Sequence, residues 1–321
     1  MCYKKSGVDI NKANKLVSWI KKLSPKIGGF SGLYKLNELN KLNKPDIYLA
    51  ASCDGVGTKL KIAQLLNKHD TVGIDLVAMN VNDVLCCGAT PLFFLDYYAC
   101  GKLNLKIAKD VIIGIKNGCE QARCVLLGGE TAEMPGFYKG NEYDLAGFAV
   151  GIIDKEKIID GTRIKNGDLI IGIPSSGLHS NGFSLIRKVF AEKEIKKFGN
   201  EFLKPTKIYV KEIQSAICNL QSAITGICHI TGGGFYDNIV RILPENCRAV
   251  IRKNRWNVPE IFKVIQKKGN ISDREMYRTF NMGIGMVMII HEFTSSRVLE
   301  LLKDSIIIGE IVKGKKGVEV V

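Results

Sequence analysis

Apolar residues recur every three to four positions in several parts of the chain, and this spacing predicts helices. The clearest stretch ends just before Pro25, has Asp9 available as an N-cap, and consists of Ala13, Leu16, Val17, Ile20 and Leu23. Further helices are expected at residues 58–66, 75–87, 105–122, 181–190, 206–220 and 258–268. Shorter apolar runs between glycine or polar residues predict strands at 47–53, 92–100, 124–127, 143–153, 169–173, 248–252, 283–290 and 306–311.

A polar stretch at residues 154–168 divides these elements into two groups. Four strands with interspersed helices precede it, which predicts an α+β domain containing a four-stranded sheet. The strands and helices after it predict an α/β domain. A chain of 321 residues also exceeds what one hydrophobic core usually serves. We therefore expect two domains, residues 1–160 and 161–321.

Composition narrows the class of protein. The net charge of +14 invites a nucleic-acid interpretation, but the basic residues are spread along the chain and no recognition motif is present. No apolar run approaches the ~18 residues that a membrane helix needs. The first residues contain no apolar segment typical of a secretory signal. The ten cysteines include no CxxC pair typical of a zinc site. We expect a cytoplasmic protein that binds neither nucleic acid nor membrane.

Four carboxylates of the first half, Asp54, Asp83, Glu130 and Glu133, lie near glycines at the ends of predicted elements. Carboxylates in such places can hold Mg²⁺, which prefers oxygen ligands and usually keeps substrate phosphates in its coordination shell. Each one can equally cap a helix or end a strand. The pattern favours a metal site without establishing it.

A glycine loop with Gly55, Gly57, Thr58 and Lys59 opens a predicted helix. Its backbone N–H groups could receive phosphate oxygens, and Lys59 could add a positive charge. The loop matches neither a Walker A motif nor a dinucleotide-binding GxGxxG motif. An ordinary glycine turn is the alternative.

Two comparable turns occur in the second half, each with a histidine. The first contains Ser176, Gly177, His179, Ser180 and Asn181. The second follows His229 and contains Thr231, Gly232, Gly233 and Gly234. Successive glycines suggest that a ligand approaches the backbone closely. An imidazole there can bind an anion or move a proton, or it can be purely structural.

Six motifs together resemble the aminoimidazole ribonucleotide synthetase family in order and spacing. They occupy residues 54–59 (DGVGTK), 83–91 (DVLCCGATP), 128–136 (GGETAEMPG), 175–182 (SSGLHSNG), 229–235 (HITGGGF) and 275–283 (EMYRTFNMG). The likeness extends from about Ser6 to near the carboxyl end.

The resemblance implies an ATP-dependent ring closure in purine biosynthesis, in which formylglycinamidine ribonucleotide becomes aminoimidazole ribonucleotide with release of ADP and phosphate. It implies a homodimer whose amino-terminal sheets join into a barrel. Asp54, Asp83 and Glu130 would hold Mg²⁺. The nucleotide would meet Glu130, Glu133, the loop from Gly55 to Lys59, and a covering segment with Gly28, Gly29 and Phe30. That segment is preceded by a stretch shorter than in many relatives.

The resemblance also suggests roles in the reaction itself. Lys59 and Asp83 would assist phosphoryl transfer. Independently of the resemblance, each turn of the second half opens a predicted helix, where unpaired N–H groups and the helix dipole favour negative charge. We therefore expect these turns, with Ser176, Asn181, Thr231 and Gly233 among their residues, to hold the ribose phosphate of the substrate, and His179 to lie near the reacting amidine as a proton acceptor.

Other functions of the same superfamily stay open. Thiamine-monophosphate kinase and selenophosphate synthetase are the alternatives, although residues 26–32 lack the reactive cysteine that the second would need. A catalytically inactive nucleotide-binding module is a further alternative. The presence of Asp54, Lys59 and Asp83 speaks against it.

Overall fold

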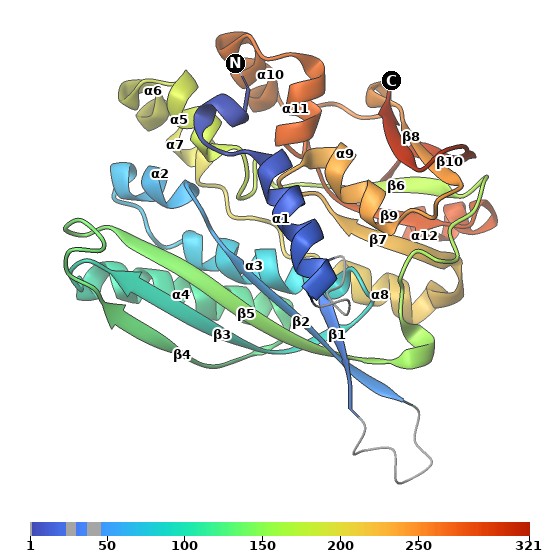
Figure 1. The fold of residues 1–321 in the computed structure, drawn as a ribbon, viewed down its shortest axis with the longest axis horizontal. Coiled ribbons are helices and arrows are strands. Elements are labelled where there is room, and N and C mark those ends of the chain that lie inside the picture. Colours follow the sequence, from blue (N-terminus) through green and yellow to red (C-terminus); the bar gives the residue numbers. More distant parts are fainter. Residues whose placement is uncertain (1, 24–29, 37–45) are drawn as a thin grey trace.

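Two sheets, each with its own helices, make up the computed structural model, which describes residues 2–23, 30–36 and 46–321 (Figure 1). The strands of the first sheet are β1 (Gly32–Lys35), β2 (Ile47–Gly55), β3 (Thr90–Cys100), β4 (Val125–Glu133) and β5 (Tyr143–Asp154). The helices of this half are α1 (Ile10–Leu23), α2 (Lys59–Leu66), α3 (Val72–Leu85) and α4 (Leu105–Ala122).

The first sheet has the strand order β1-β2-β5-β3-β4, and only β3 and β4 run parallel. The four expected strands are present, and β1 adds a fifth at the edge by pairing with β2 from Gly32 opposite Ala51 to Lys35 opposite Tyr48. Strand β4 continues to Glu133 because residues 128–133 pair with β3. The expectation that it ends at Leu127 is wrong.

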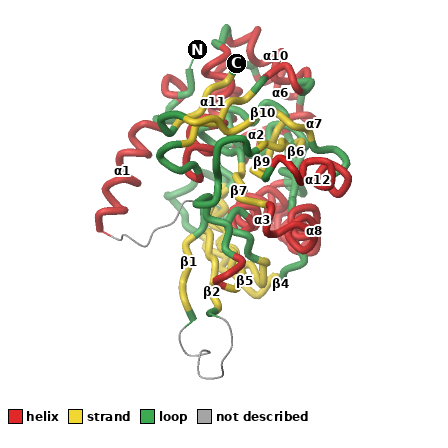
Figure 2. Tube along the Cα trace, turned by 90° about the vertical axis from the view of Figure 1, so that its right-hand side faces the viewer, coloured by secondary structure: helices red, strands yellow, loops and turns green. Residues whose placement is uncertain are grey.

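Helix α3 is buried on two sides, since it packs on the first sheet and also on β7 and α8 of the second half (Figure 2). Its sequence is accordingly apolar nearly all round rather than amphipathic. Glycines let α4 approach it closely: a Cβ at Gly73 would lie 2.2 Å from the carbonyl oxygen of Val111. Helix α3 is therefore the element that carries residues of the first half to the boundary with the second.

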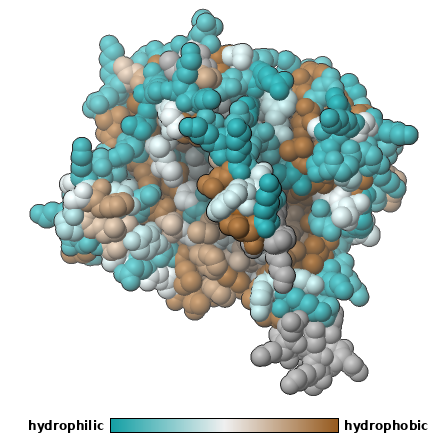
Figure 3. Space-filling view, in the orientation of Figure 1, coloured by the Kyte–Doolittle hydropathy of each residue, from teal (hydrophilic) through white to brown (hydrophobic). Residues whose placement is uncertain are grey.

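The other face of the first sheet is open. Val125 and Leu127 of β4 are 60% and 62% exposed, and Tyr97 of β3 and Phe148 of β5 are each 40% exposed. Apolar side chains gather over this part of the surface (Figure 3). Groups of exposed large apolar side chains mark interaction surfaces.

The second sheet has the order β11-β8-β10-β6-β9-β7, and only β8 and β11 run parallel. Its strands are β6 (Leu169–Pro174), β7 (Ile224–His229), β8 (Cys247–Ile251), β9 (Ile284–Ile290), β10 (Ile306–Lys313) and β11 (Gly317–Val320). Its helices are α5 (Phe183–Val189), α6 (Glu192–Lys197), α7 (Gly199–Phe202), α8 (Val210–Leu220), α9 (Gly234–Ile239), α10 (Glu260–Gly269), α11 (Asp273–Thr279) and α12 (Ser295–Leu301).

The expected two-part architecture is confirmed, whereas the boundary near residue 160 stays a prediction. The N-cap expected at Asp9 is also confirmed, because its Oδ1 accepts a hydrogen bond from the backbone N–H of Lys12 at 3.1 Å. Within the described ranges, no helix is both long and apolar enough to cross a bilayer.

Candidate functional site

Asp54, Asp83 and His229 meet where the two halves of the chain face each other. Asp54 lies near the end of β2, Asp83 in the last turns of α3, and His229 at the end of β7. Nδ1 of His229 lies 2.8 Å from Oδ1 of Asp83. Asn80, one turn before Asp83 on α3, donates to the carbonyl oxygen of Asp54 at 3.3 Å. The sequence named these three residues from separate motifs, and the fold brings them together.

The carboxylates of Asp54 and Asp83 repel each other, and Asp54 is largely buried. Burial, and next the negative charge of Asp83, raise the pKa of Asp54 to about 6, against the hydrogen bond from the Gly55 N–H and the influence of His229. A cation between the two carboxylates would relieve this repulsion. The part of the chain that the structure describes holds no group of three or more His, Cys, Asp or Glu side chains suited to a metal. Two carboxylates fit Mg²⁺, which commonly completes its shell with phosphate oxygens and water.

Replacement of Asp54 by Asn is expected to stabilise the protein in the absence of divalent cations. The pKa of Asp54 in the fold lies above its unfolded value, so its charge opposes folding at pH 8 and the cost is relieved as the pH falls through about 6. The difference between a pKa of about 6 in the fold and the ordinary value of 3.8 corresponds to roughly 2–3 kcal/mol. Urea unfolding at pH 8 with a chelator should show a gain of this order in the variant.

The pH dependence supplies the control for Asp54→Asn. The free energy of unfolding of the wild type should rise between pH 8 and about pH 5 by a component that the variant lacks, since the folded state binds the extra proton there. A variant less stable than the wild type at pH 8 would contradict the repulsion inferred for Asp54 and Asp83.

Glu130 does not join this cluster within one chain, which corrects the expected three-carboxylate set. In the register of the sheet, Glu130 of β4 is level with Gly55 of β2, but β5 and β3 lie between the two strands. Three strand spacings amount to about 14 Å. Directly paired residues share a face, and Glu130 pairs with Tyr97 on the open face. Asp54 pairs with Gly147, which faces α3, because a Cβ there would lie 2.7 Å from Nδ2 of Asn80.

Glu133, the second acidic residue of this motif, lies at the end of β4. Its Oε1 accepts a hydrogen bond from the backbone N–H of Leu103 at 2.9 Å. Its observed role is therefore to hold the loop that leads into α4. It stays a candidate for nucleotide binding only through its exposed position.

Lys59 is fully buried, which corrects the expectation that it reaches phosphate. Its Nζ donates to Oδ1 of Asp75 at 2.9 Å, to the carbonyl oxygen of His179 at 3.0 Å and to that of Lys204 at 2.7 Å. An ammonium has three donors, and all three are used. Gly57 and Thr58, just before it, are exposed at the start of α2. The loop itself thus stays open to an anion although the lysine does not.

His179 organises backbone rather than facing a ligand. It is 1% exposed and has the unusual φ of +59° for a residue other than glycine. Its Nε2 accepts from the backbone N–H groups of Ser176 at 3.2 Å and Lys207 at 3.5 Å. Burial, and then the neighbouring charges of His229, Lys59 and Lys207, lower the pKa of His179 well below its ordinary value. Its basic nitrogen is already occupied, so the expected role of proton acceptor is corrected.

The two turns of the second half lie against each other. A methyl group added at Gly232 would lie 3.2 Å from Oδ1 of Asn181. Nδ2 of Asn181 is buried and has no hydrogen-bond partner among the described residues. A buried donor left without a partner costs free energy unless a ligand or water satisfies it. Nδ1 of His179 is likewise buried without a partner among the described residues, but Asn181 is the one that lies beside the glycine backbone of the second turn, and we take it as the ligand-binding candidate.

Other side chains of the two turns are already committed to the protein. Oγ of Ser176 donates to the carbonyl oxygen of Pro205 at 2.6 Å, and Oγ of Ser180 lies 2.9 Å from Oγ1 of Thr206. The carbonyl oxygen of Gly177 accepts from Nδ2 of Asn281 at 2.9 Å. Oγ1 of Thr231 donates to Oδ1 of Asn238 at 3.4 Å. These contacts shape the turns and leave their glycine backbone as the surface available to a ligand.

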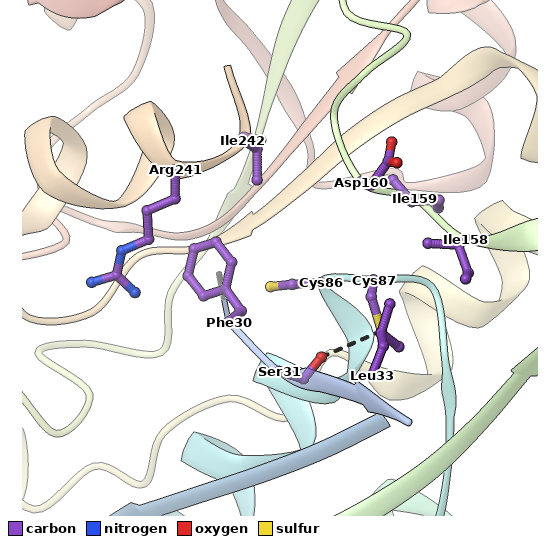
Figure 4. A pocket seen from close by; sticks show the side chains of 10 residues that line it. All are labelled: Phe30, Ser31, Leu33, Cys86, Cys87, Ile158, Ile159, Asp160, Arg241 and Ile242. Carbon is purple, nitrogen blue, oxygen red and sulfur yellow. Dashed lines mark hydrogen bonds between the residues drawn. The ribbon is translucent and has the colours of Figure 1, made fainter. Parts of the chain in front are cut away.

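A cavity of about 240 Å³ lies at the carboxyl end of α3, the helix that carries Asp83 (Figure 4). It is lined by Phe30, Ser31, Leu33, Cys86, Cys87, Ile158, Ile159, Asp160, Arg241 and Ile242. Cys86 and Cys87 follow Asp83 by about one helical turn. The guanidinium of Arg241 lies over the ring of Phe30, 5.1 Å from its centroid. Phe30 is thus the described member of the expected covering segment, whereas Gly28 and Gly29 lie outside the described residues.

Asp75 and Arg241 are site-region residues that the sequence interpretation missed. Asp75 is completely buried in α3, where its neighbours Ile74, Leu76 and Val77 are apolar. A charged residue in such a stretch needs a partner of opposite charge. That signal was present in the sequence, but nothing in it identified Lys59 as the partner.

Comparisons with known proteins agree with the sequence motifs. The family described as AIR synthase related protein, N-terminal domain, matches residues 36–153, and its C-terminal domain family matches residues 165–321. A phosphoribosylformylglycinamidine cyclo-ligase of Thermoanaerobacter pseudethanolicus is 53% identical, with 99% of each chain covered. A chloroplastic protein of the same name from Arabidopsis thaliana is 50% identical over 98% of this chain and 82% of its own.

Solved structures with the same fold are more distant in sequence. Thiamine monophosphate kinase from Aquifex aeolicus superposes with a TM-score of 0.66 at 18% identity, covering 95% of this chain and 96% of the other. The hydrogenase maturation protein HypE in complex with ATP gives a TM-score of 0.65 at 17% identity, covering 85% and 82%. At such identities the likeness concerns the fold alone.

Proposed function

The chain belongs to the AIR synthase related family, and we propose that it closes the imidazole ring of aminoimidazole ribonucleotide from formylglycinamidine ribonucleotide, using ATP and releasing ADP and phosphate. The observation that carries this proposal is the identity of about half of all residues, along nearly the whole chain, to proteins named for this reaction. The arrangement of Asp54, Asp83 and His229 supplies chemistry that the reaction needs.

The reaction has to make an amide oxygen leave. That oxygen is a poor leaving group, so it first takes the γ-phosphoryl group of ATP, and the bond from phosphorus to ADP breaks. The amidine nitrogen then attacks the activated carbon, its proton passes to the medium, and the oxygen departs within phosphate. Both steps depend chiefly on positioning and on neutralisation of phosphate charge.

We assign the phosphate end of ATP to Asp54, Asp83 and the open loop at Gly57 and Thr58. Mg²⁺ held by the two carboxylates would supply positive charge against the phosphate oxygens. Asp83 is held in place by His229, which is itself buried. Nε2 of His229 lies 3.5 Å from Nδ2 of Asn82. The N–H groups of Leu60 and Lys61 already donate to the carbonyl oxygens of Gly57 and Thr58, so the exposed backbone of Gly57 and Thr58 itself is the part of this loop that suits phosphate oxygens.

We assign the base of the nucleotide to the cavity beside Cys86 and Cys87 (Figure 4). Its apolar lining suits a flat ring, and Phe30 offers an aromatic face. Ser31 and Asp160 add polar groups to its lining that could distinguish one base from another. The cavity begins about one helical turn from Asp83, which allows base and phosphates to be bound together.

The substrate is assigned to the contact between the two turns of the second half. Asn181 would donate its free amide hydrogens to a phosphate or amide oxygen, and Gly232 allows the ligand close to the backbone. The helices after these turns are short, so the specific donor of Asn181 carries this assignment more than any helix dipole.

We also propose that the chain forms a homodimer through the open face of the first sheet. Val125, Leu127, Tyr97 and Phe148 would be buried by a second copy. Glu130 lies on the same face, so any contact it makes with nucleotide or metal would involve that second copy.

Leu127→Arg is expected to weaken the dimer by roughly 100-fold or more, because it places an unpaired charge in an apolar interface. Sedimentation velocity over a dilution series is the measurement. Phe293→Arg, at an 81% exposed phenylalanine of the second half, is the matched control and should leave the dimer unchanged. A dimer that survives Leu127→Arg would place the interface elsewhere.

A substrate panel tests the proposed function. Purified protein is given Mg²⁺ and ATP with formylglycinamidine ribonucleotide, thiamine monophosphate or no second substrate, and ADP is measured. We expect ADP release only with formylglycinamidine ribonucleotide. Release with thiamine monophosphate would favour a kinase, and no release with any substrate would favour an inactive binding module.

A further inference from the structure

The buried ion pair of Lys59 and Asp75 joins the two halves of the chain. Both side chains have no exposed surface, and Nζ of Lys59 lies 2.9 Å from Oδ1 of Asp75. Lys59 begins α2 and Asp75 lies in α3, so both belong to the first half. Their remaining partners, however, all belong to the second half.

One oxygen of the Asp75 carboxylate accepts most of its hydrogen bonds from one short segment of the second half. Its Oδ1 accepts from the backbone N–H of Thr206 at 2.7 Å and from Oγ1 of the same residue at 2.6 Å. It also accepts from Oγ of Ser180 at 3.2 Å. With Lys59 included, four donors lie within hydrogen-bond distance of Oδ1, whereas Oδ2 is buried and has no partner among the described residues.

The lysine completes the connection from the other side. It donates to the carbonyl oxygen of His179, within the turn from Ser176 to Asn181 that we call the substrate turn, and to that of Lys204, two residues before Thr206. The carbonyl oxygen that accepts from Lys59 belongs to His179, whose backbone has a left-handed φ of +59°. A residue other than glycine keeps that conformation only when its surroundings hold it there. Lys59 follows directly after Gly57 and Thr58, the open loop assigned to phosphate.

We propose that Lys59 and Asp75 are positioning residues. They fix the substrate turn of the second half against the loop at Gly57 and Thr58 of the first half, to which we assigned the phosphates of ATP. The inference rests on the proposed function for the identity of the two ligands. Phosphoryl transfer requires the reacting oxygen and phosphorus to be held in line, and a displacement of 1 Å can cost about 100-fold in rate. A buried ion pair suits this task, since separating the two partners would leave an uncompensated charge in the interior.

The test compares Lys59→Met, Asp75→Asn and the double variant Lys59→Met/Asp75→Asn. The double variant leaves no unpaired charge in the interior. Each is expected to raise the KM for formylglycinamidine ribonucleotide roughly tenfold or more and to lower kcat, because the substrate turn shifts. The Kd for ATP with Mg²⁺, measured by calorimetry, should stay within about twofold. The effects of the two single changes should not add, since both break one unit.

Two further variants keep the test decisive. Lys61→Met alters a half-exposed lysine two residues further along α2, paired with Glu142, and should behave as wild type. Thr206→Val removes only one donor to Asp75 and nearly keeps the side-chain volume, so it should fold even where the charge variants do not. It should raise the KM for the substrate roughly threefold with unchanged ATP binding.

The outcomes separate this inference from the proposed function. If the wild type does not turn over formylglycinamidine ribonucleotide, the proposed function fails. If the wild type is active and Lys59→Met weakens ATP binding tenfold while Asp75→Asn does not, Lys59 is a phosphate ligand and the inference is overturned. Wild-type kinetics in both Thr206→Val and the folded double variant would also overturn it.

Discussion

Asp83→Asn is expected to lower ADP release by roughly 10³-fold while the protein stays folded. Asp83 has two tasks in the proposed site: it faces Asp54 across the position assigned to Mg²⁺, and its Oδ1 holds Nδ1 of His229 at 2.8 Å. Asparagine keeps the shape and an oxygen for His229 but removes the charge. The ADP assay and a urea unfolding curve on the same sample measure both parts of this expectation.

Asp304→Asn is the matched control for this change, since Asp304 is an exposed carboxylate of the second half. It should show wild-type turnover. If Asp83→Asn also retained wild-type turnover, Asp83 would hold neither metal nor phosphate, and the assignment of the carboxylate cluster would fail.

Asn181→Ala is expected to weaken binding of formylglycinamidine ribonucleotide by roughly 10- to 100-fold, the usual effect of losing a hydrogen bond to a charged group. Binding of ATP should change by less than about twofold, because Asn181 belongs to the substrate turns. Stability should not fall by more than the small packing loss, since Nδ2 has no partner among the described residues. Calorimetric titration of the variant with each ligand separately measures the difference.

Asn219→Ala, at an exposed asparagine of α8, is the control and should bind both ligands normally. An equal loss for both ligands in Asn181→Ala would contradict the division between the halves. Gly233→Val is a less suitable probe of the same turns. Gly233 has φ of +95°, and an added Cβ would lie 2.6 Å from Cβ of Asp237, so a valine would distort the turn before any ligand was bound.

Local sequence signals predicted the elements that local interactions define. Helix α4 was predicted with its observed bounds, because its apolar stripe begins directly after Asn104, whose Oδ1 accepts from the N–H groups of Lys106 and Ile107. Strand β1 was not predicted. It is four residues long and depends on pairing with β2, which begins at Ile47, later in the chain.

The site shows the same limit. Asp54 and Asp83 were named as metal candidates because acidic residues beside glycines are visible in the sequence, and this role stays a prediction. His229 was noted in its glycine turn without a defined role, and only the fold places it against Asp83. Glu130 was grouped with Asp54 and Asp83 because the sequence does not reveal strand order or register. These place Glu130 three strands away from Asp54 and on the opposite face of the sheet. The partners of Lys59 lie 16, 120 and 145 residues away along the chain, and no local pattern indicates them.

The fate of one oxygen atom tests the central claim most directly. Formylglycinamidine ribonucleotide labelled with ¹⁸O at the formyl oxygen is converted with Mg²⁺ and ATP, and the released phosphate is analysed by mass spectrometry. We expect one ¹⁸O atom in each phosphate, matched by one ADP and one aminoimidazole ribonucleotide, because the phosphorylated oxygen leaves with phosphorus. Unlabelled phosphate formed together with the ring product would contradict activation of the amide oxygen by phosphoryl transfer.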